Sequence, residues 1–281
     1  MALDFGGAAN RYINLGSGAT IDDIPTGTVL IWCNYNDNAG ERRVLTKGSS
    51  EQWRWEWRGD LSPKVMSFII LRVSAPVLQV RSNLTNYVAY TANKPLCLVA
   101  TWDVTGVDTD QKTYIGDLNQ IPREPSSYVT QTVGSVARNS DAAGDLILFG
   151  DTFFGFDGLG YVVIGWRHRL HPQQIVEAWK MYRPGSHGDP RLISPDVLIW
   201  MPLGQNGASQ VQRDFSGQAN HGIVTGATSA SDHPLFIPSP IYRRRPRVRG
   251  DKAAAAVFFP ELYSPFQDLP GGHRQREVVG Y

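Results

Sequence analysis

The chain lacks most of the features that mark exported, membrane-spanning or disulfide-linked proteins. It has only two cysteines, Cys33 and Cys97, and each lies in an apolar run, which predicts buried free thiols. No apolar run approaches the roughly 20 residues of a membrane span, so we expect no membrane partner. No basic and apolar leader precedes the first strand-like segment, which predicts folding in a cytoplasm without a secretory signal peptide.

Motifs of hydrolytic catalysis are also missing. The sequence contains no G-x-S-x-G and no H-E-x-x-H pattern, and its six histidines are scattered without the spacing of metal ligands. We therefore expect no enzyme and no cofactor, apart from the calcium considered below.

Charge is balanced overall but not along the chain. The net charge is +1, which gives no reason to expect a nucleic-acid partner. From Pro238 onward the chain has eight Lys and Arg against four Asp and Glu (+4), whereas residues 1–237 have 19 against 22 (−3). A mildly acidic body thus precedes a basic segment with six prolines, which predicts an extended arm over residues 238–281.

The chain does have aromatic and turn-forming residues in a β pattern. Eight Trp, eleven Tyr and eleven Phe favour strands, and 28 Gly and 18 Pro favour many turns. Short strand-like runs alternate with turn clusters, which predicts a sandwich rather than alternating strands and helices. The predicted strands are Thr28–Tyr35, Trp53–Arg58, Val65–Val73, Val77–Arg81, Tyr87–Tyr90, Leu96–Trp102, Lys112–Gly116 and Leu146–Gly150.

One helix and two further strands follow. The helix is predicted from His171 to Met181, because proline stands in its first turn and no breaker interrupts it. Val197–Met201 and Ile223–Val224 are predicted strands joined by a turn that contains Asp214. We expect a sandwich over residues 1–237, with its core in 1–185 and strapped-on strands in 194–226, followed by the arm.

Three parts of the sequence together carry a family resemblance: Leu3–Gly16 (LDFGGAANRYINLG), Pro95–Asp103 with Thr113–Gly116, and Phe156–Ile175. They resemble the concanavalin A-like, laminin-G-like jelly-roll domains. The resemblance implies an all-β jelly-roll β-sandwich with one short helix and an extended C-terminal arm. Residues 197–224 carry W-x-P-L before D-x-S-G-x-x-N-H-G and are similar to a known block of these proteins. Here the block follows the helix, an arrangement that resembles the one in bacteriophage structural proteins.

Members of this fold bind surfaces or sugars, and only some are enzymes. Its retaining glucanases resemble one another in a strand with Glu-x-Asp-x-x-Glu, which sets two carboxylates about 5–5.5 Å apart, and that motif is missing here. The favoured function is therefore that of a non-catalytic virion structural protein of a bacteriophage. Capsid decoration or cement is favoured over tail or fibre attachment. It would assemble in the host bacterial cytoplasm with other virion proteins such as the major capsid protein, in a homo-oligomer or symmetric assembly. A lectin-like module that binds glycans is the alternative, and a glycan hydrolase is the third.

Candidate site residues fall into three groups. Trp53, Trp55 and Trp57 share one face of a strand, where they either stack on glycans or fill the core, and their alternation with charged residues favours the core. Asp151 and Asp157 bracket a loop and are candidate calcium ligands, or simply turn residues. The arm supplies the candidate partner-binding residues Arg243, Arg244, Arg245, Arg247, Arg249, Phe258, Phe259, Leu262, Tyr263 and Phe266.

Overall fold

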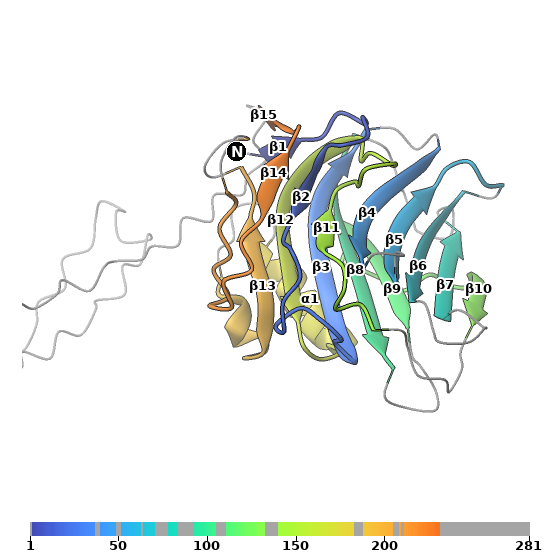
Figure 1. Ribbon diagram of the computed structural model, residues 1–281. Helices are drawn as coiled ribbons and strands as arrows, with labels where there is room; N and C mark the ends of the chain where they lie inside the picture. Colours follow the sequence, from blue (N-terminus) through green and yellow to red (C-terminus); the bar gives the residue numbers. More distant parts are fainter. Residues whose placement is uncertain are drawn as a thin grey trace, which may run out of the picture. The chain divides into compact units, whose positions relative to one another are not determined.

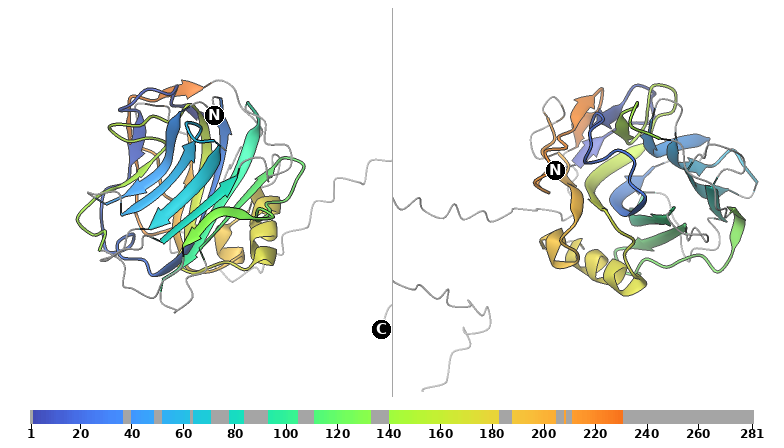
Figure 2. Two further views of the ribbon diagram at one scale, coloured as in Figure 1. Left: turned by 90° about the vertical axis from the view of Figure 1, so that its right-hand side faces the viewer. Right: turned by 60° about the horizontal axis from the view of Figure 1, so that its bottom comes forward.

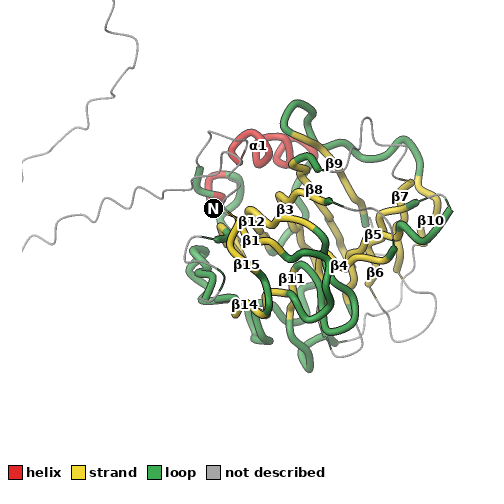
Figure 3. The backbone as a smooth tube through the Cα atoms, turned by 90° about the horizontal axis from the view of Figure 1, so that it is seen from above, coloured by secondary structure: helices red, strands yellow, loops and turns green. Residues whose placement is uncertain are grey.

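Two antiparallel sheets lie face to face, and a single α-helix, α1 (Pro172–Tyr182), covers the outer side of one of them (Figure 1, Figure 3). The computed structural model describes residues 2–36, 40–48, 52–62, 64–70, 78–83 (backbone only), 93–104, 111–132, 140–182, 188–204, 208 and 211–230. The predicted strand Tyr87–Tyr90 and the arm, with all its candidate partner-binding residues, lie outside the described residues.

Sheet A has seven strands in the order β15-β1-β12-β3-β8-β9, with β13 also paired to β12. Its strands are β1 (Ala2–Asp4), β3 (Thr26–Tyr35), β8 (Pro95–Asp103), β9 (Lys112–Asp117), β12 (Gly158–Trp166), β13 (Val197–Pro202) and β15 (Thr228–Ala230). Sheet B has eight strands in the order β10-β7-β6-β5-β4-β11-β2-β14. They are β2 (Tyr12–Asn14), β4 (Glu41–Lys47), β5 (Trp53–Arg58), β6 (Val65–Ile70), β7 (Leu78–Asn83), β10 (Tyr128–Thr132), β11 (Leu146–Leu148) and β14 (Ile223–Thr225).

The main core fills the space between the sheets with aromatic rings. Strand pleating sends alternate residues of β5 inward, where Trp53 meets Trp102 of sheet A with ring centroids 4.7 Å apart. Tyr35 stacks on Trp57 at 5.1 Å in the same layer. Rings at these separations add favourable contacts to a large apolar burial. Aromatic packing therefore helps to hold the two sheets together, beside the many aliphatic side chains of the same core.

A second core lies between sheet A and α1. The buried residues of α1 are Ile175, Ala178, Trp179 and Tyr182, and they join Trp32 and Trp166 of the sheet. At the helix start Gln174 accepts a hydrogen bond from the backbone N–H of His171 at 2.9 Å, which caps the first turn. The predicted helix is confirmed, with bounds Pro172–Tyr182. No helix in the described part of the chain is long and apolar enough to cross a bilayer.

The strands after α1 complete both sheets. β13 pairs with β12 from Val162 to Trp166, next to the segment where β12 pairs with β1, so two strands share one edge of β12. β14 pairs with β2 in sheet B. Asp214, between β13 and β14, accepts four hydrogen bonds, from the backbone N–H groups of Trp200, Ser216 and Asn220 and from the Ser216 hydroxyl. This buried carboxylate fixes the turn that joins the two sheets.

Cys33 and Cys97 lie on adjacent strands but point to opposite faces of sheet A. Cys33 belongs to the core between the sheets and Cys97 to the core under α1. Both are free and fully buried, so the predicted unlinked thiols are confirmed. Burial raises the pKa of both thiols well above the ordinary value.

The sequence pattern does not predict β4 and β10. β4 reads Glu-Arg-Arg-Val-Leu-Thr-Lys, so four of its seven residues are charged. A register shift between Arg43 and Leu45 also interrupts its alternation of inward and outward residues. β4 therefore lacks the alternation of apolar and polar residues that marks an ordinary strand. It is accommodated in the sheet because partners distant in sequence neutralise its charges.

Trp166 tests the packing of the second core. Its side chain is 0% exposed, and its indole N–H donates to the Pro190 carbonyl at 3.3 Å. Trp166→Ala should lower the free energy of unfolding by about 3–5 kcal/mol, measured by urea denaturation. Leu192→Ala is the control, because that side chain is 79% exposed. A loss below about 1 kcal/mol in Trp166→Ala would contradict the burial.

Candidate functional site

The outer face of sheet B carries a group of charged side chains on β4 and β5 (the strands lie side by side in Figure 2). Because Trp53, Trp55 and Trp57 point into the core, Arg54, Glu56 and Arg58 must point away from it. Cross-strand pairing places Arg43 directly opposite Glu56. This charged face is exposed only in part, because Glu56 is 0% exposed.

Glu56 is the centre of this group, which we call the Glu56 network (Glu41, Arg43, Arg54, Glu56, Arg58). Its carboxylate forms an ion pair with Arg43, and it lies 3.1 Å from Arg54 Nε and 3.8 Å from Arg58 Nη1. Glu41 lies 2.6 Å from Arg43 and 3.6 Å from Arg58. One buried carboxylate thus orients three guanidinium groups.

The members of the Glu56 network differ in exposure. Arg43 is 2% exposed, whereas the side chains of Arg54 and Arg58 are 27% and 19% exposed. A two-point hydrogen bond to Asp60, at 2.9 and 2.7 Å, raises the pKa of Arg58 above its ordinary value, and Glu41 adds to the effect. Arg54 and Arg58 therefore present charged N–H groups to solvent from fixed positions.

A short loop after β11, residues 149–155, closes over one side of the Glu56 network. Asp151 Oδ2 lies 3.4 Å from Arg43 Nε, and the Arg43 guanidinium stands 4.5 Å above the Phe154 ring. Asp151 Oδ1 accepts hydrogen bonds from the backbone N–H groups of Phe153 and Phe154, each at 2.6 Å. Asp151 thus shapes its own turn and helps to bury Arg43.

The two candidate calcium ligands are used in different places. Asp151 bonds within its loop and to Arg43, whereas Asp157 accepts from the Asn36 amide at 3.4 Å. Within the part of the chain that the structure describes, no three His, Cys, Asp or Glu side chains gather as metal ligands. Calcium at Asp151 and Asp157 stays a prediction of the sequence.

The interpretation of Trp53, Trp55 and Trp57 as a glycan-stacking surface is wrong. Their exposed fractions are 3%, 0% and 1%, and all three belong to the core between the sheets. A ring without an open face has no room for a sugar. Their alternation with charged residues marks a core strand, which was the favoured interpretation of the pattern.

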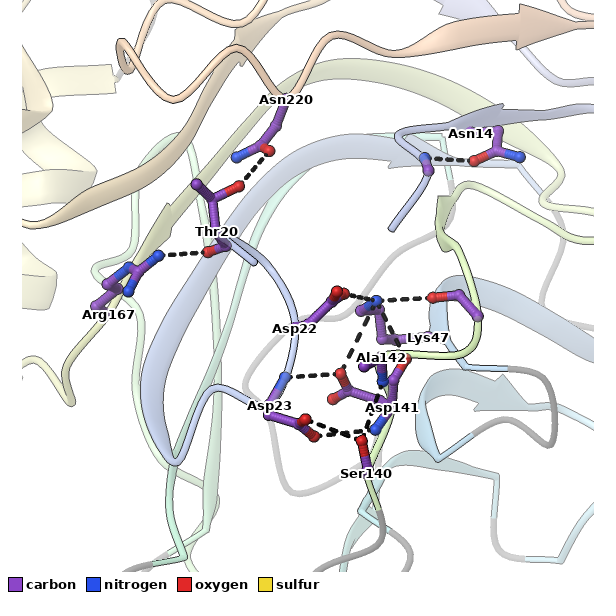
Figure 4. A network of polar contacts seen from close by, with 12 residues as sticks. Asn14, Thr20, Asp22, Asp23, Lys47, Ser140, Asp141, Ala142, Arg167 and Asn220 are labelled. Atoms are coloured by element: carbon purple, nitrogen blue, oxygen red, sulfur yellow. Dashed lines mark hydrogen bonds and ion pairs between the residues drawn. The ribbon is translucent and has the colours of Figure 1, made fainter. Parts of the chain in front are cut away.

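A second polar group, the Lys47 network (Asp22, Asp23, Lys47 and Asp141), joins β4 to two loops (Figure 4). Lys47 is 0% exposed, and its ammonium lies 2.6 Å from Asp22 Oδ1, 2.7 Å from the Gly144 carbonyl and 3.3 Å from the Asp141 carbonyl. Asp23 and Asp141 exchange hydrogen bonds between the backbone N–H of each and the carboxylate of the other, at 2.8 and 3.1 Å. The buried ammonium of Lys47 is thus held by one carboxylate and two carbonyl oxygens, which indicates a structural role for this network.

One grouping has the residue types of a serine hydrolase but not the geometry. His168 Nδ1 lies 3.4 Å from Ser194 Oγ and 4.0 Å from Asp196 Oδ2. A proton relay needs the serine on one ring nitrogen and the carboxylate on the other. Because both approach the same nitrogen, these residues do not form a catalytic triad.

Comparisons with known proteins identify the fold. No family model and no curated protein matches the chain. A "putative carbohydrate binding protein" from Bacteroides ovatus has a TM-score of 0.54 at 14% identity, over 84% of this chain and 61% of that one. The tailspike protein 2 of an Escherichia coli O157:H7 bacteriophage reaches 0.46 at 11% identity, over 72% and 30% of the two chains. Domains LG4-5 of the mouse laminin α1 chain reach 0.40 at 11% identity, over 61% and 43%.

The fold is the concanavalin A-like jelly roll. The all-β, two-sheet architecture that the sequence segments imply by resemblance is therefore confirmed. The chain spans 61% of the length of the Bacteroides ovatus protein, so the likeness concerns one part of that molecule.

Sequence reasoning missed the central members of the jelly roll's polar groups. Arg43 and Lys47 stand on β4, the strand that the pattern did not predict, and Asp22 and Asp141 come from separate loops. The available signal was the charged run Glu41-Arg42-Arg43 beside an apolar pair, Val44 and Leu45. Charges next to buried positions indicate ion pairs in the fold.

Lys47→Met tests the second network. The substitution keeps an apolar stem of similar length but leaves Asp22 and the buried Asp141 without their cation. Removing one partner of a buried pair costs about 3–5 kcal/mol, so the urea midpoint should fall strongly. Lys180→Met is the control, because the Lys180–Glu177 pair lies on the solvent side of α1 and should leave the midpoint unchanged. Equal midpoints for both variants would show that the Lys47 network contributes nothing to stability.

Proposed function

We propose that this jelly roll is a non-catalytic binding module that holds a glycan on the outer face of sheet B. The observation that carries the proposal is the Glu56 network, in which a fully buried carboxylate orients the partly exposed Arg54 and Arg58. Fixed guanidinium groups suit sugar hydroxyls, because their planar N–H donors are already in place when the ligand arrives. The structurally similar Bacteroides ovatus protein is described as carbohydrate-binding, which supports glycans as the ligand class.

The charge of the face supports neutral glycans over strongly acidic ones. Arg43, Arg54 and Arg58 are balanced by Glu41 and Glu56, and Asp60 and Asp151 add two further carboxylates beside them. A polyanion would meet these four carboxylates against three guanidinium groups. Hydroxyl groups can use both, because they donate to carboxylates and accept from guanidiniums.

The geometry of the network gives no support to glycan hydrolysis. A glycosidase needs two carboxyl groups that flank the bond, one to donate a proton and one to attack or activate water. Glu56 is fully buried and is engaged by three guanidinium groups, so its oxygen atoms do not face a substrate. The proposed module therefore binds glycans without cleaving them.

A printed glycan array with the full-length protein tests this function. Arg54→Ala should weaken binding to the glycans retained by the wild type about tenfold, because one charge-assisted hydrogen bond is lost. Arg213→Ala is the matched control, because Arg213 is an exposed arginine outside sheet B that stacks on Phe215. No reducing ends should be released from the bound glycans. Absence of binding to every glycan, or equal loss in both variants, would refute the proposal.

A second candidate function is a structural role in a bacteriophage particle, with capsid decoration or cement favoured over tail or fibre attachment. The observation that favours it is the composition of residues 238–281, where five arginines stand between positions 243 and 249 and aromatic residues follow. Such a segment suits docking on a neighbouring subunit with acidic and apolar patches, such as a major capsid protein.

Deletion of residues 238–281 tests the particle role. The truncated protein should keep the urea midpoint of the full chain and lose incorporation into particles, because the sandwich core lies before residue 238. Attachment of the full chain should weaken only partly with added salt, since salt screens the arginines but not the aromatic anchors. Full occupancy of particles by the truncated protein would refute a role for the arm.

A further inference from the structure

The loop 149–155 presents Phe153 with 79% of the residue exposed. Among the described Phe, Tyr and Trp residues it is the only exposed one. All eight tryptophans, by contrast, are buried. Exposure alone decides nothing, because single exposed apolar side chains are common on protein surfaces. Phe153 differs from other exposed apolar side chains in the hydrogen bonds that hold its loop and in the residues that the loop contacts.

The loop is held closed by its own backbone. Asp151 Oδ1 accepts from the N–H groups of Phe153 and Phe154 at 2.6 Å each, and the Asp151 N–H donates to the Phe154 carbonyl at 2.9 Å. Gly150 and Gly155 form a β-bridge at the base of the loop. A ring on such a loop has lost most of its backbone freedom before any ligand arrives, which favours affinity.

The residue before this base is bulky and has an unusual backbone conformation. Phe149 has φ of 60°, a left-handed value that is uncommon for a large side chain. Its ring is stacked on Phe5 at 4.8 Å and meets Phe156 at 5.1 Å in the core. The core thus compensates for the conformation that turns the chain outward toward Phe153.

The loop also contacts the Glu56 network. Arg43 lies against Asp151 and over the Phe154 ring, and Arg43 pairs with Glu56. Phe153 therefore belongs to a loop that packs, through Asp151 and Phe154, against the buried arginine of the Glu56 network. Small-ligand sites combine these two elements, apolar surface for contact and a few fixed polar groups for orientation.

We propose that Phe153 is a stacking platform for one pyranose ring of the bound glycan, and that it selects sugars with equatorial hydroxyls, such as glucose, xylose or N-acetylglucosamine. These sugars expose C–H groups on their ring faces, whereas an axial hydroxyl, as in mannose, interrupts one face. The phenyl ring covers the apolar face while the Glu56 network bonds the hydroxyl edge. This inference rests on the proposed glycan-binding function.

The experiment compares variants on an array of glucosyl, xylosyl, N-acetylglucosaminyl and mannosyl oligosaccharides. Phe153→Ala should weaken binding to the equatorial sugars about tenfold. Phe153→Leu should also weaken it, because an aliphatic side chain lacks the flat face, and Phe153→Trp should retain it. Leu192→Ala is the matched control, since Leu192 is equally exposed at 79% on the 3-10 turn η2 (Pro190–Leu192) and should bind as the wild type does.

Phe153→Trp also supplies a direct readout of contact. Since the eight native tryptophans are buried, the added indole would be the exposed one, and acrylamide should quench it in excess of the wild type. The oligosaccharide that binds best on the array should protect this indole from acrylamide. Circular dichroism and the urea midpoint check that each variant is folded, as expected for substitutions of an exposed residue.

The outcomes separate the two proposals. If the wild type binds no oligosaccharide, the glycan-binding function fails and the stacking role fails with it. If the wild type binds while Phe153→Ala binds equally well, or if the added indole stays unprotected, the stacking role alone is overturned. If Phe153→Ala impairs attachment to particles and leaves glycan binding intact, the ring contacts a protein and the inference is wrong.

Discussion

The pleat of β5 is the constraint on which the rest of the molecule depends. Trp53, Trp55 and Trp57 fill the space between the sheets, so the residues between them must face outward. A slip of one residue would put Arg54, Glu56 and Arg58 into the core and the indoles on the surface. The outer charges are thus positioned as firmly as the aromatic core, and surface chemistry follows from hydrophobic packing.

The fold was largely predictable from the sequence because its strongest signals are local. The inward side of β5, the strands β3 and β8, and the helix at Pro172 each follow from a short pattern of residues. Strand β4 was not predicted, because the contacts that stabilise it are not local in sequence. Its charged residues are compatible with a buried strand only because β5 and loops from elsewhere in the chain neutralise them.

The candidate site was less predictable, because each of its groups needs partners from several strands and loops. Glu56 is oriented by Arg43 across a strand boundary, and Arg43 in turn needs Asp151 and Phe154 from a loop more distant in sequence. Pairs with such separations leave no periodic trace in one sequence. Asp151 shows the same limit, since a turn-forming aspartate and a calcium ligand have the same appearance in a sequence.

The pairing of β1 has a consequence for how the chain assembles. Leu3 lies between Gly160 of β12 and Ser229 of β15, so both strand partners of β1 are made long after it. During synthesis the ribosome must deliver residues up to 230 before sheet A can be completed, and pairings of this sequence separation form slowly. The apolar start of the chain, including Leu3 and Phe5, stays without its final cover through that interval. Sheet A can therefore be completed only after the last described strand is made, although its first strand is made at the outset.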